Sequence, residues 1–327
     1  MTPGKTSSSS LLDDNTVRER AAVIADPHPP TTTARRLIGL AHAARPKQWI
    51  KNLACFAGLV FAQLLFKEQA VLRALLAFAG FCLASSSVYL LNDVCDRELD
   101  RANPSKQKRP VASGLVPASW ALAASAGLLA VAMGSSWLLS PLCAALMATY
   151  LVTNVAYSLR LKHAVLLDVG VIAFGFVLRV LYGVYAVGVK PTPWIVLCMF
   201  FLALFLGFAK RRGEMHRMSD EEEPFRRPVL AKYRKSFLDM QLAMTATMSI
   251  LCYALYTVTG AGNASLVVTV PLVTYGVTRY MLLVMVDGQG EAPEKLLVSD
   301  RLLVGTAVLW LVLCVVILYS KKNIFAG

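Results

Sequence analysis

Nine apolar stretches constrain this chain more than any other feature. They cover residues 49–66, 72–92, 118–139, 141–159, 165–188, 193–209, 238–259, 265–286 and 302–319. Because an α-helix rises about 1.5 Å per residue, about 20 apolar residues cross the hydrocarbon core of a membrane. Of all residues, 56% are hydrophobic and 16% charged, as in membrane proteins. The sequence therefore predicts an all-α, polytopic membrane protein with about nine transmembrane helices around a cytoplasm-facing cavity.

The positive charges predict the orientation, since Lys and Arg are retained on the cytoplasmic side. With a cytoplasmic N-terminus, the charged segments 97–109, 160–162, 210–235 and 295–301 all lie inside. We therefore expect the N-terminus and the active site to face the cytoplasm, in the cell (inner) membrane. Residues 1–35 are polar and predict a disordered cytoplasmic tail, with residues 36–327 forming one transmembrane domain.

The formal net charge of +13 favours anionic lipid head groups and phosphorylated substrates as partners. We find no nucleic-acid-binding module and no signal for an oligomeric state. The seven cysteines and four histidines do not show metal-ligand spacing, and the cysteines are expected to be packing residues.

The strongest chemical signal follows the second apolar stretch. One amide, three carboxylates and two basic side chains form this motif: Asn92, Asp93, Asp96, Asp100, Lys106 and Arg109. At about 100° per residue, the three aspartates fall within a narrow arc of one helix face. Carboxylates so close repel one another unless a hard cation such as Mg²⁺ lies between them, and Mg²⁺ completes its shell with water and phosphate oxygens. The motif predicts a Mg²⁺–diphosphate site; solvated charges that cap a membrane helix are the alternative.

A second polar junction lies between the fourth and fifth stretches. It contains Tyr157, Lys162 and Asp168, with Arg179 eleven residues further on. Eleven residues bring a helix back to nearly the same face, so Asp168 and Arg179 can point into one cavity. An arginine inside a membrane is costly and usually lines a polar site or pairs with a carboxylate. We predict phosphate binding by Lys162 and Arg179, with Asp168 as a further metal-shell ligand; a buried Asp168–Arg179 pair that only fixes packing is the alternative.

The start of the first stretch and the end of the sixth add further polar side chains. Four residues at helical spacing open the first stretch: Lys47, Gln48, Lys51 and Asn52. Read as an α-helix, they form one polar face that can receive the phosphate of a lipid whose tail stays in the bilayer. Interfacial lipid anchors are the alternative. Lys210 and Arg211, at the end of the sixth stretch, are further candidates for binding phosphate.

The acidic motif, N-D-x-x-D-x-x-x-D with a basic tail, resembles the first signature of the UbiA prenyltransferase superfamily. Together with R-P-K-Q-W-x-K-N, Y-S-x-x-L-K-x-x-x-x-x-D and K-R-R-x-E, it resembles the decaprenyl-phosphate phosphoribosyltransferase branch, from about Arg45 to Glu214. The resemblance implies that Mg²⁺ is held by Asp93, Asp96 and Asp100. It also implies transfer of a 5-phosphoribosyl group from phosphoribosyl pyrophosphate to a polyprenyl phosphate.

Aromatic prenyltransferases of the superfamily usually carry D-x-x-x-D at the second junction. Here Ile172 stands four residues after Asp168, so a second fully acidic metal site is not expected. This difference argues against an aromatic prenyltransferase, which is the nearer alternative function. A transporter without chemistry is the farther one, and such proteins place their ion sites near the middle of the membrane rather than at its rim.

Overall fold

The computed structural model describes residues 32–217, 228–290 and 293–320, and every regular element in these ranges is a helix. Eight of the described segments are long and apolar enough to cross a membrane. They are α4 (Glu68–Cys95), α6 (Ala118–Leu139), α7 (Pro141–Leu159), α8 (Leu167–Ala186), α9 (Pro193–Arg217), α10 (Lys235–Thr259), η5 (Ala264–Thr269) with α11 (Val270–Met285), and α13 (Arg301–Tyr319). The shorter elements are α2 (Thr33–Ala43), η1 (Pro46–Phe56), α3 (Ala57–Phe61), α5 (Arg97–Ala102), η2 (Leu161–His163), η4 (Pro228–Lys232) and α12 (Pro293–Ser299). The prediction of an all-α multi-pass membrane protein is confirmed.

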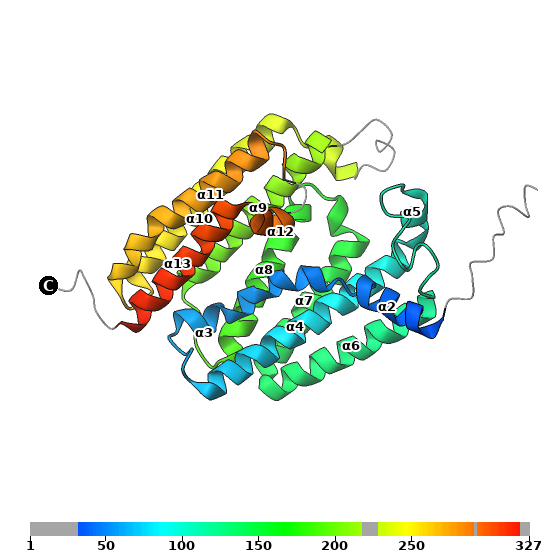
Figure 1. The fold of residues 1–327 in the computed structure, drawn as a ribbon, viewed down its shortest axis with the longest axis horizontal. Coiled ribbons are helices and arrows are strands. Elements are labelled where there is room, and N and C mark those ends of the chain that lie inside the picture. The colour runs from blue at the N-terminus through cyan, green and yellow to red at the C-terminus, as the bar shows by residue number, and fades with distance from the viewer. Residues whose placement is uncertain (1–31, 218–227, 291–292, 321–327) are drawn as a thin grey trace, which may run out of the picture.

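The long helices form two groups that lie side by side (Figure 1). Helices α4, α6, α7 and α8 share a core built around Phe81, Met147 and Tyr182. Helices α9, α10 and α11 share a second core that includes Phe205 and Leu242. The contact between α8 and α9 joins the two groups.

The polar connections gather at one end of the bundle, which we call the acidic end. It contains the last turn of α4, all of α5, the connection from α7 to α8, the end of α9 and the start of α10. Ion pairs join these segments: Lys162 lies 3.5 Å from Asp96, and Arg212 lies 2.8 Å from Asp239. The described parts of three predicted charged segments, 97–109, 160–162 and 210–235, thus contribute to this end, and the side of the membrane that it faces stays a prediction.

Arg73 joins three helices at the opposite end. From the second turn of α4, its Nε donates to the carbonyl of Ala186 at 2.5 Å, and its Nη2 donates to the carbonyl of Leu139 at 2.8 Å. These carbonyls end α8 and α6, and the last carbonyls of a helix have no partner within it. One guanidinium therefore donates hydrogen bonds to the terminal carbonyls of two helices.

The first predicted span, 49–66, is not a long α-helix. Residues Pro46–Phe56 form the 3₁₀ helix η1, and Ala57–Phe61 form one short α-helix. Among the described residues the structure thus supports eight long apolar helices rather than nine. Because a 3₁₀ helix rises about 2.0 Å per residue, η1 and α3 together still extend for about 30 Å.

Glycines explain how closely η1 and α3 pack on α8. A Cβ at Gly183 would lie 1.9 Å from the carbonyl oxygen of Cys55, and a Cβ at Gly58 would lie 2.7 Å from the Cα of Val184. Only hydrogen fits at these two positions, so the backbones touch directly. Hydropathy cannot show this contact, and a hydropathy pattern therefore could not distinguish the 3₁₀ segment from an α-helix.

Candidate active site

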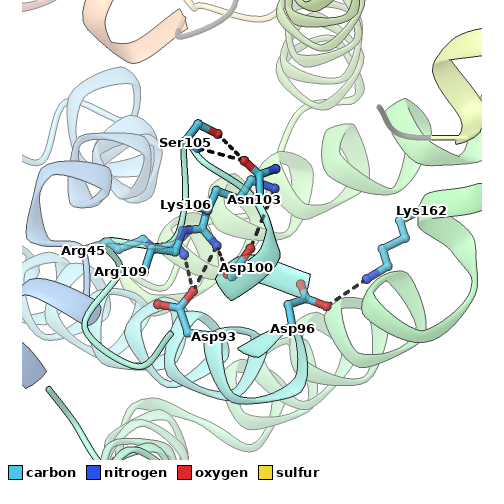
Figure 2. A network of polar contacts seen from close by, with 9 residues as sticks. All are labelled: Arg45, Asp93, Asp96, Asp100, Asn103, Ser105, Lys106, Arg109 and Lys162. Carbon is cyan, nitrogen blue, oxygen red and sulfur yellow. Dashed lines mark hydrogen bonds and ion pairs between the residues drawn. The ribbon is translucent and has the colours of Figure 1, made fainter. Parts of the chain in front are cut away.

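Three aspartates occupy the end of α4 and the start of α5, and we call Asp93, Asp96 and Asp100 the acidic triad. Helix α4 ends at Cys95, and Asp96 caps it with φ −91° and ψ 7° before α5 begins at Arg97. This break turns Asp96 away from the face that the sequence predicted for all three carboxylates. Asp93 and Asp100 are buried, whereas the side chain of Asp96 is 38% exposed. Asp96 points toward Lys162 and away from Asp93 (Figure 2).

Arg109 connects the two buried carboxylates. Its Nη1 atom lies 2.6 Å from Oδ2 of Asp100 and 3.5 Å from Oδ1 of Asp93. Lys106 lies 3.9 Å from Asp100, and the loop between them is ordered by Asn103, whose side chain accepts a hydrogen bond from the backbone of Ser105 at 3.0 Å. The loop that follows α5 therefore folds back over the carboxylates (Figure 2).

Two other segments also reach the acidic triad. Arg45, which precedes η1, forms an ion pair with Asp93, and its guanidinium lies 4.8 Å from the ring centroid of Tyr89. Lys162 in η2 pairs with Asp96 at 3.5 Å. Each carboxylate of the triad thus has a basic partner, and these partners come from three separate parts of the chain.

Asn92 connects the acidic triad to α7. Its Oδ1 accepts a hydrogen bond from Ser158 at 2.7 Å. Tyr157, which is half-buried, precedes Ser158. The structure therefore brings the first two polar motifs of the sequence together.

Asp168 forms a separate buried network. Its Oδ2 accepts a hydrogen bond from Nε of Arg211 at 2.6 Å, and its Oδ1 accepts one from the hydroxyl of Tyr233 at 2.6 Å. Arg211 also pairs with Glu214 at 2.6 Å. Burial raises the pKa of the Tyr233 phenol, and its hydrogen bond to Asp168 raises it further, so it stays protonated as a donor.

Arg179 does not pair with Asp168, contrary to the predicted alternative of an ion pair between them. Its guanidinium donates to Oδ1 of Asn52 at 2.8 Å, to the carbonyl of Gly175 at 2.9 Å and to the hydroxyl of Tyr150 at 3.0 Å. The rings of Tyr150, Phe81 and Phe176 surround it. Within the described ranges, the partners of this buried cation are therefore neutral groups.

The polar face predicted for the first stretch is divided, because η1 repeats every three residues and not every 3.6. Lys47 lies on the exposed row with Ile50, and Asn52 lies on the buried row with Cys55. Lys51 is half-buried and falls with Gln48 on a third row. Lys47 and Lys51 therefore do not share a face, and Asn52 is held by Arg179 and by Ser85, to which it donates at 3.2 Å.

Residues 52–299 match the model of the UbiA prenyltransferase family, which is more than half of the chain. The chain belongs to this family. The relatives that it resembles include a protein from Mycolicibacterium smegmatis that is 36% identical over 292 residues, or 84% of this chain and 90% of the relative. Another, from Corynebacterium glutamicum, is 30% identical over 319 residues, or 94% of this chain and 91% of the relative. Both are named decaprenyl-phosphate phosphoribosyltransferase.

Solved UbiA structures show the same fold. A UbiA homolog from Archaeoglobus fulgidus, bound to GPP and Mg²⁺, has a TM-score of 0.66 and 19% sequence identity, covering 86% of this chain and 98% of its own. A digeranylgeranylglyceryl phosphate synthase structure has a TM-score of 0.61 and 20% identity, covering 87% and 99%.

The acidic triad of this UbiA protein fits a divalent cation through two of its carboxylates. In the described ranges, no three His, Cys, Asp or Glu side chains are arranged to hold a metal ion. Asp93 and Asp100, however, already lie on either side of one cationic nitrogen, Nη1 of Arg109. Mg²⁺ commonly takes one or two carboxylates and fills its other positions with water and phosphate oxygens. The pair therefore suits Mg²⁺, whereas Asp96 contacts Lys162 instead.

The structure adds three residues that the sequence did not assign to this UbiA site: Arg45, Tyr150 and Tyr233. Arg45 opens the motif R-P-K-Q-W-x-K-N, but the sequence does not reveal its left-handed backbone conformation, with φ 54°. Tyr150 lies seven residues before Tyr157 on α7, so helical spacing could have identified it. Tyr233 is 65 residues from Asp168 and carried no signal.

Proposed function

We propose that this protein transfers the 5-phosphoribosyl group of phosphoribosyl pyrophosphate to a polyprenyl phosphate of the decaprenyl type and releases pyrophosphate. Relatives with that name at 30–36% identity over most of the chain support the proposal. The observation that carries it is the charge distribution at the acidic end.

Basic groups outnumber acidic groups around the acidic triad. The triad is contacted by four cations: Arg45, Lys106, Arg109 and Lys162. The one carboxylate at the second junction, Asp168, is already neutralised by Arg211. A single acidic site rich in cations suits ligands that bring several phosphates, namely a donor with a diphosphate and a 5-phosphate and an acceptor with its own phosphate. A prenyl diphosphate and an aromatic acceptor with a single carboxylate, such as 4-hydroxybenzoate, bring less negative charge.

Different residues of the acidic end would bind the metal ion and orient the ligands. Asp93 and Asp100, with Asp96 after release from Lys162, would hold Mg²⁺, which supplies Lewis-acid assistance to the departing pyrophosphate. Asn92, held by Ser158, orients a phosphate or a bound water. Because the acceptor phosphate is already ionised at neutral pH, the reaction does not require a strong base, and catalysis rests on positioning and electrostatics.

Cations from four elements, η1, η2, α8 and α9, bind the phosphates in this proposal. Lys162, Arg179 and Lys210 bind those of the donor, and Lys47 and Lys51 bind that of the acceptor, with Tyr157 at the ribose. The three-residue repeat of η1 separates the two lysines, so we expect one of them to contribute more than the other. Arg211, which the sequence offered as a candidate phosphate ligand, instead forms the buried ion pair with Asp168.

The acceptor tail needs an apolar site. A cavity of about 420 Å³ lies between α3 and the second group of helices, lined by Phe61, Met199, Tyr253 and Trp310 among others. Lipid-like chains suit such walls. A decaprenyl chain is much larger than this cavity, so we propose that only part of the tail occupies it and that the rest lies in the bilayer. We also propose that the acidic end faces the cytoplasm in the cell membrane, in line with the positive charges that gather there.

The decisive experiment incubates the purified protein with Mg²⁺, phosphoribosyl pyrophosphate and decaprenyl phosphate. A parallel reaction contains polyprenyl diphosphate and 4-hydroxybenzoate. We expect a phosphoribosylated lipid and pyrophosphate in the first reaction and no prenylated ring in the second. Product in the second reaction alone would replace the proposal with an aromatic prenyltransferase activity, and no product in either would favour a protein without this chemistry.

A further inference from the structure

Arg45 has an unfavourable backbone conformation. Its φ of 54° and ψ of 59° lie in the left-handed region, which residues other than Gly, Asn and Asp seldom occupy. The following residue is Pro46, which further restricts the residue before it. Such outliers persist where the surrounding structure enforces them, and they cluster at functional sites.

The conformation of Arg45 directs its guanidinium to the acidic triad. The backbone turns sharply here: Arg45 N–H donates to the carbonyl of His42 at 3.1 Å, and the carbonyl of Arg45 accepts from the backbone N–H of Gln48 at 2.9 Å. The side chain then crosses the face of Tyr89 and pairs with Asp93. Arg45 thus reaches Asp93 from a segment 48 residues away in sequence.

This pairing conflicts with metal binding. A divalent cation at Asp93 and Asp100 would lie beside the guanidinium of Arg45, and like charges at that separation repel strongly where water is scarce. Because the side chain of Arg45 is 30% exposed, it can leave Asp93 without entering an apolar environment. A diphosphate that arrives with the metal offers oxygens to which a guanidinium binds well.

We propose that Arg45 exchanges partners, pairing with Asp93 before the donor binds and with the diphosphate of the donor afterwards, so that metal and diphosphate bind together. This inference rests on the proposed function. Arg45 is therefore a residue that disfavours the metal alone and favours the metal–diphosphate complex. The two effects have opposite signs, which a residue that merely supports the fold would not produce.

The test measures binding rather than turnover. Mn²⁺, which accepts the same oxygen ligands, is titrated into the purified full-length protein without pyrophosphate and followed by electron paramagnetic resonance. The affinity for radiolabelled inorganic pyrophosphate is then measured at saturating Mn²⁺ by equilibrium dialysis. Wild type is compared with Arg45→Gln, with Arg45→Gly and with the control Arg35→Gln, which changes an exposed arginine on α2. Glycine accepts a positive φ, so Arg45→Gly removes the guanidinium and relieves the backbone, and thermal unfolding reports whether each variant folds.

We expect both Arg45 variants to bind Mn²⁺ alone about threefold or more tighter, and pyrophosphate with Mn²⁺ about tenfold or more weaker, than wild type. The control should match wild type in both measurements. Weaker binding of both ligands, or no change in either, would overturn the exchange while leaving the metal–diphosphate site in place. Wild type that fails to bind pyrophosphate even with Mn²⁺ would instead refute the proposed function, and the exchange with it.

Discussion

Two arginine–aspartate pairs of the acidic end have the same length and opposite surroundings. Arg109 lies 2.6 Å from Asp100, and Arg211 lies 2.6 Å from Asp168. The side chain of Arg109 is 32% exposed, whereas that of Arg211 is 1% exposed and that of Asp168 is fully buried. The difference shows that the length of an ion pair does not reveal its role, because the access of the cation to water decides whether it can change partners.

The cost of separating each pair follows from this access. The guanidinium of Arg109 reaches water, so it can leave Asp100, whose side chain is only 5% exposed, at little cost once another cation takes its place. A buried pair that loses one partner leaves an uncompensated charge and costs about 3–5 kcal/mol. The acidic triad is therefore suited to exchange cations with a ligand, and the Asp168 network is suited to hold α8, α9 and the segment of Tyr233 together.

The largest effect is expected for Asp93→Asn. Losing a metal-shell carboxylate should lower turnover by about a thousandfold or more, since each 1.4 kcal/mol of lost transition-state stabilisation is about tenfold. The unfolding temperature should stay close to that of wild type, because the partners Arg45 and Arg109 keep access to water. Radiolabelled donor assays and thermal unfolding in detergent measure the two quantities. Chelator should abolish wild-type activity and Mg²⁺ should restore it; turnover near wild type in the variant would contradict the metal assignment.

The second prediction concerns the buried pair, where Asp168→Asn should destabilise the protein by about 1.5–3 kcal/mol. The neutral amide weakens the charge-assisted contacts with Arg211 and Tyr233, although Arg211 keeps Glu214 as a second counter-ion. Thermal unfolding in detergent measures the loss. Asp300→Asn is the matched control, since Asp300 pairs with Arg279 at 2.8 Å in a more exposed place, and its stability loss should be much smaller. Similar losses in both variants would show that burial does not separate the two kinds of pair.

Arg179→Ala tests a buried cation whose partners are neutral. If Arg179 binds donor phosphate, the KM for phosphoribosyl pyrophosphate should rise about tenfold or more, because a charge-assisted contact contributes about 1.5–3 kcal/mol. The KM for the lipid should change less. Tyr150→Phe, which keeps the guanidinium and removes one of its hydrogen-bond partners, is the control. A protein that loses its fold, with equal effects on both substrates in the remaining activity, would assign Arg179 to packing.

The smallest effect is expected for Tyr233→Phe. The change removes a hydrogen bond to the Asp168 carboxylate and the oxygen that accepts from the backbone N–H of Leu166 at 2.8 Å. A loss of about 1.5 kcal/mol in unfolding free energy is expected, with turnover per folded molecule unchanged. Denaturation by heat and steady-state kinetics measure the two. Reduced turnover at unchanged stability would move Tyr233 from the buried network into the active site.

Hydropathy and charge predicted much of this molecule. They identified the eight long helices and the gathering of charge at one end, since both depend on properties that each segment carries by itself. The contact between Asp100 and Arg109 could also be expected from the sequence, because both belong to one motif and lie only nine residues apart.

The remaining features depend on contacts between distant segments. The helix η1 packs on α8 at Gly183, where the missing Cβ lets the backbone of Cys55 touch the backbone of α8. Hydropathy reports how apolar a segment is and not how closely two backbones approach. The partner of Asp168 is 43 residues away, whereas the sequence offered Arg179 on the same helix. The α-helical spacing that placed Lys47 beside Lys51 was wrong for the same reason, since a packed 3₁₀ helix replaces the period of 3.6 with 3.0.

Arg73 sets an order for the assembly of the protein during synthesis. Its helix, α4, is made before α6 and α8, whose terminal carbonyls Leu139 and Ala186 it binds. Until residue 186 has been added, the guanidinium lacks one of its two partners and is best accommodated at the watery surface of the membrane. The N-terminal part of α4 therefore reaches its final position only after α8 has been made. In nascent chains that stop before residue 186, this part of α4 should take a different position from the one in the complete protein.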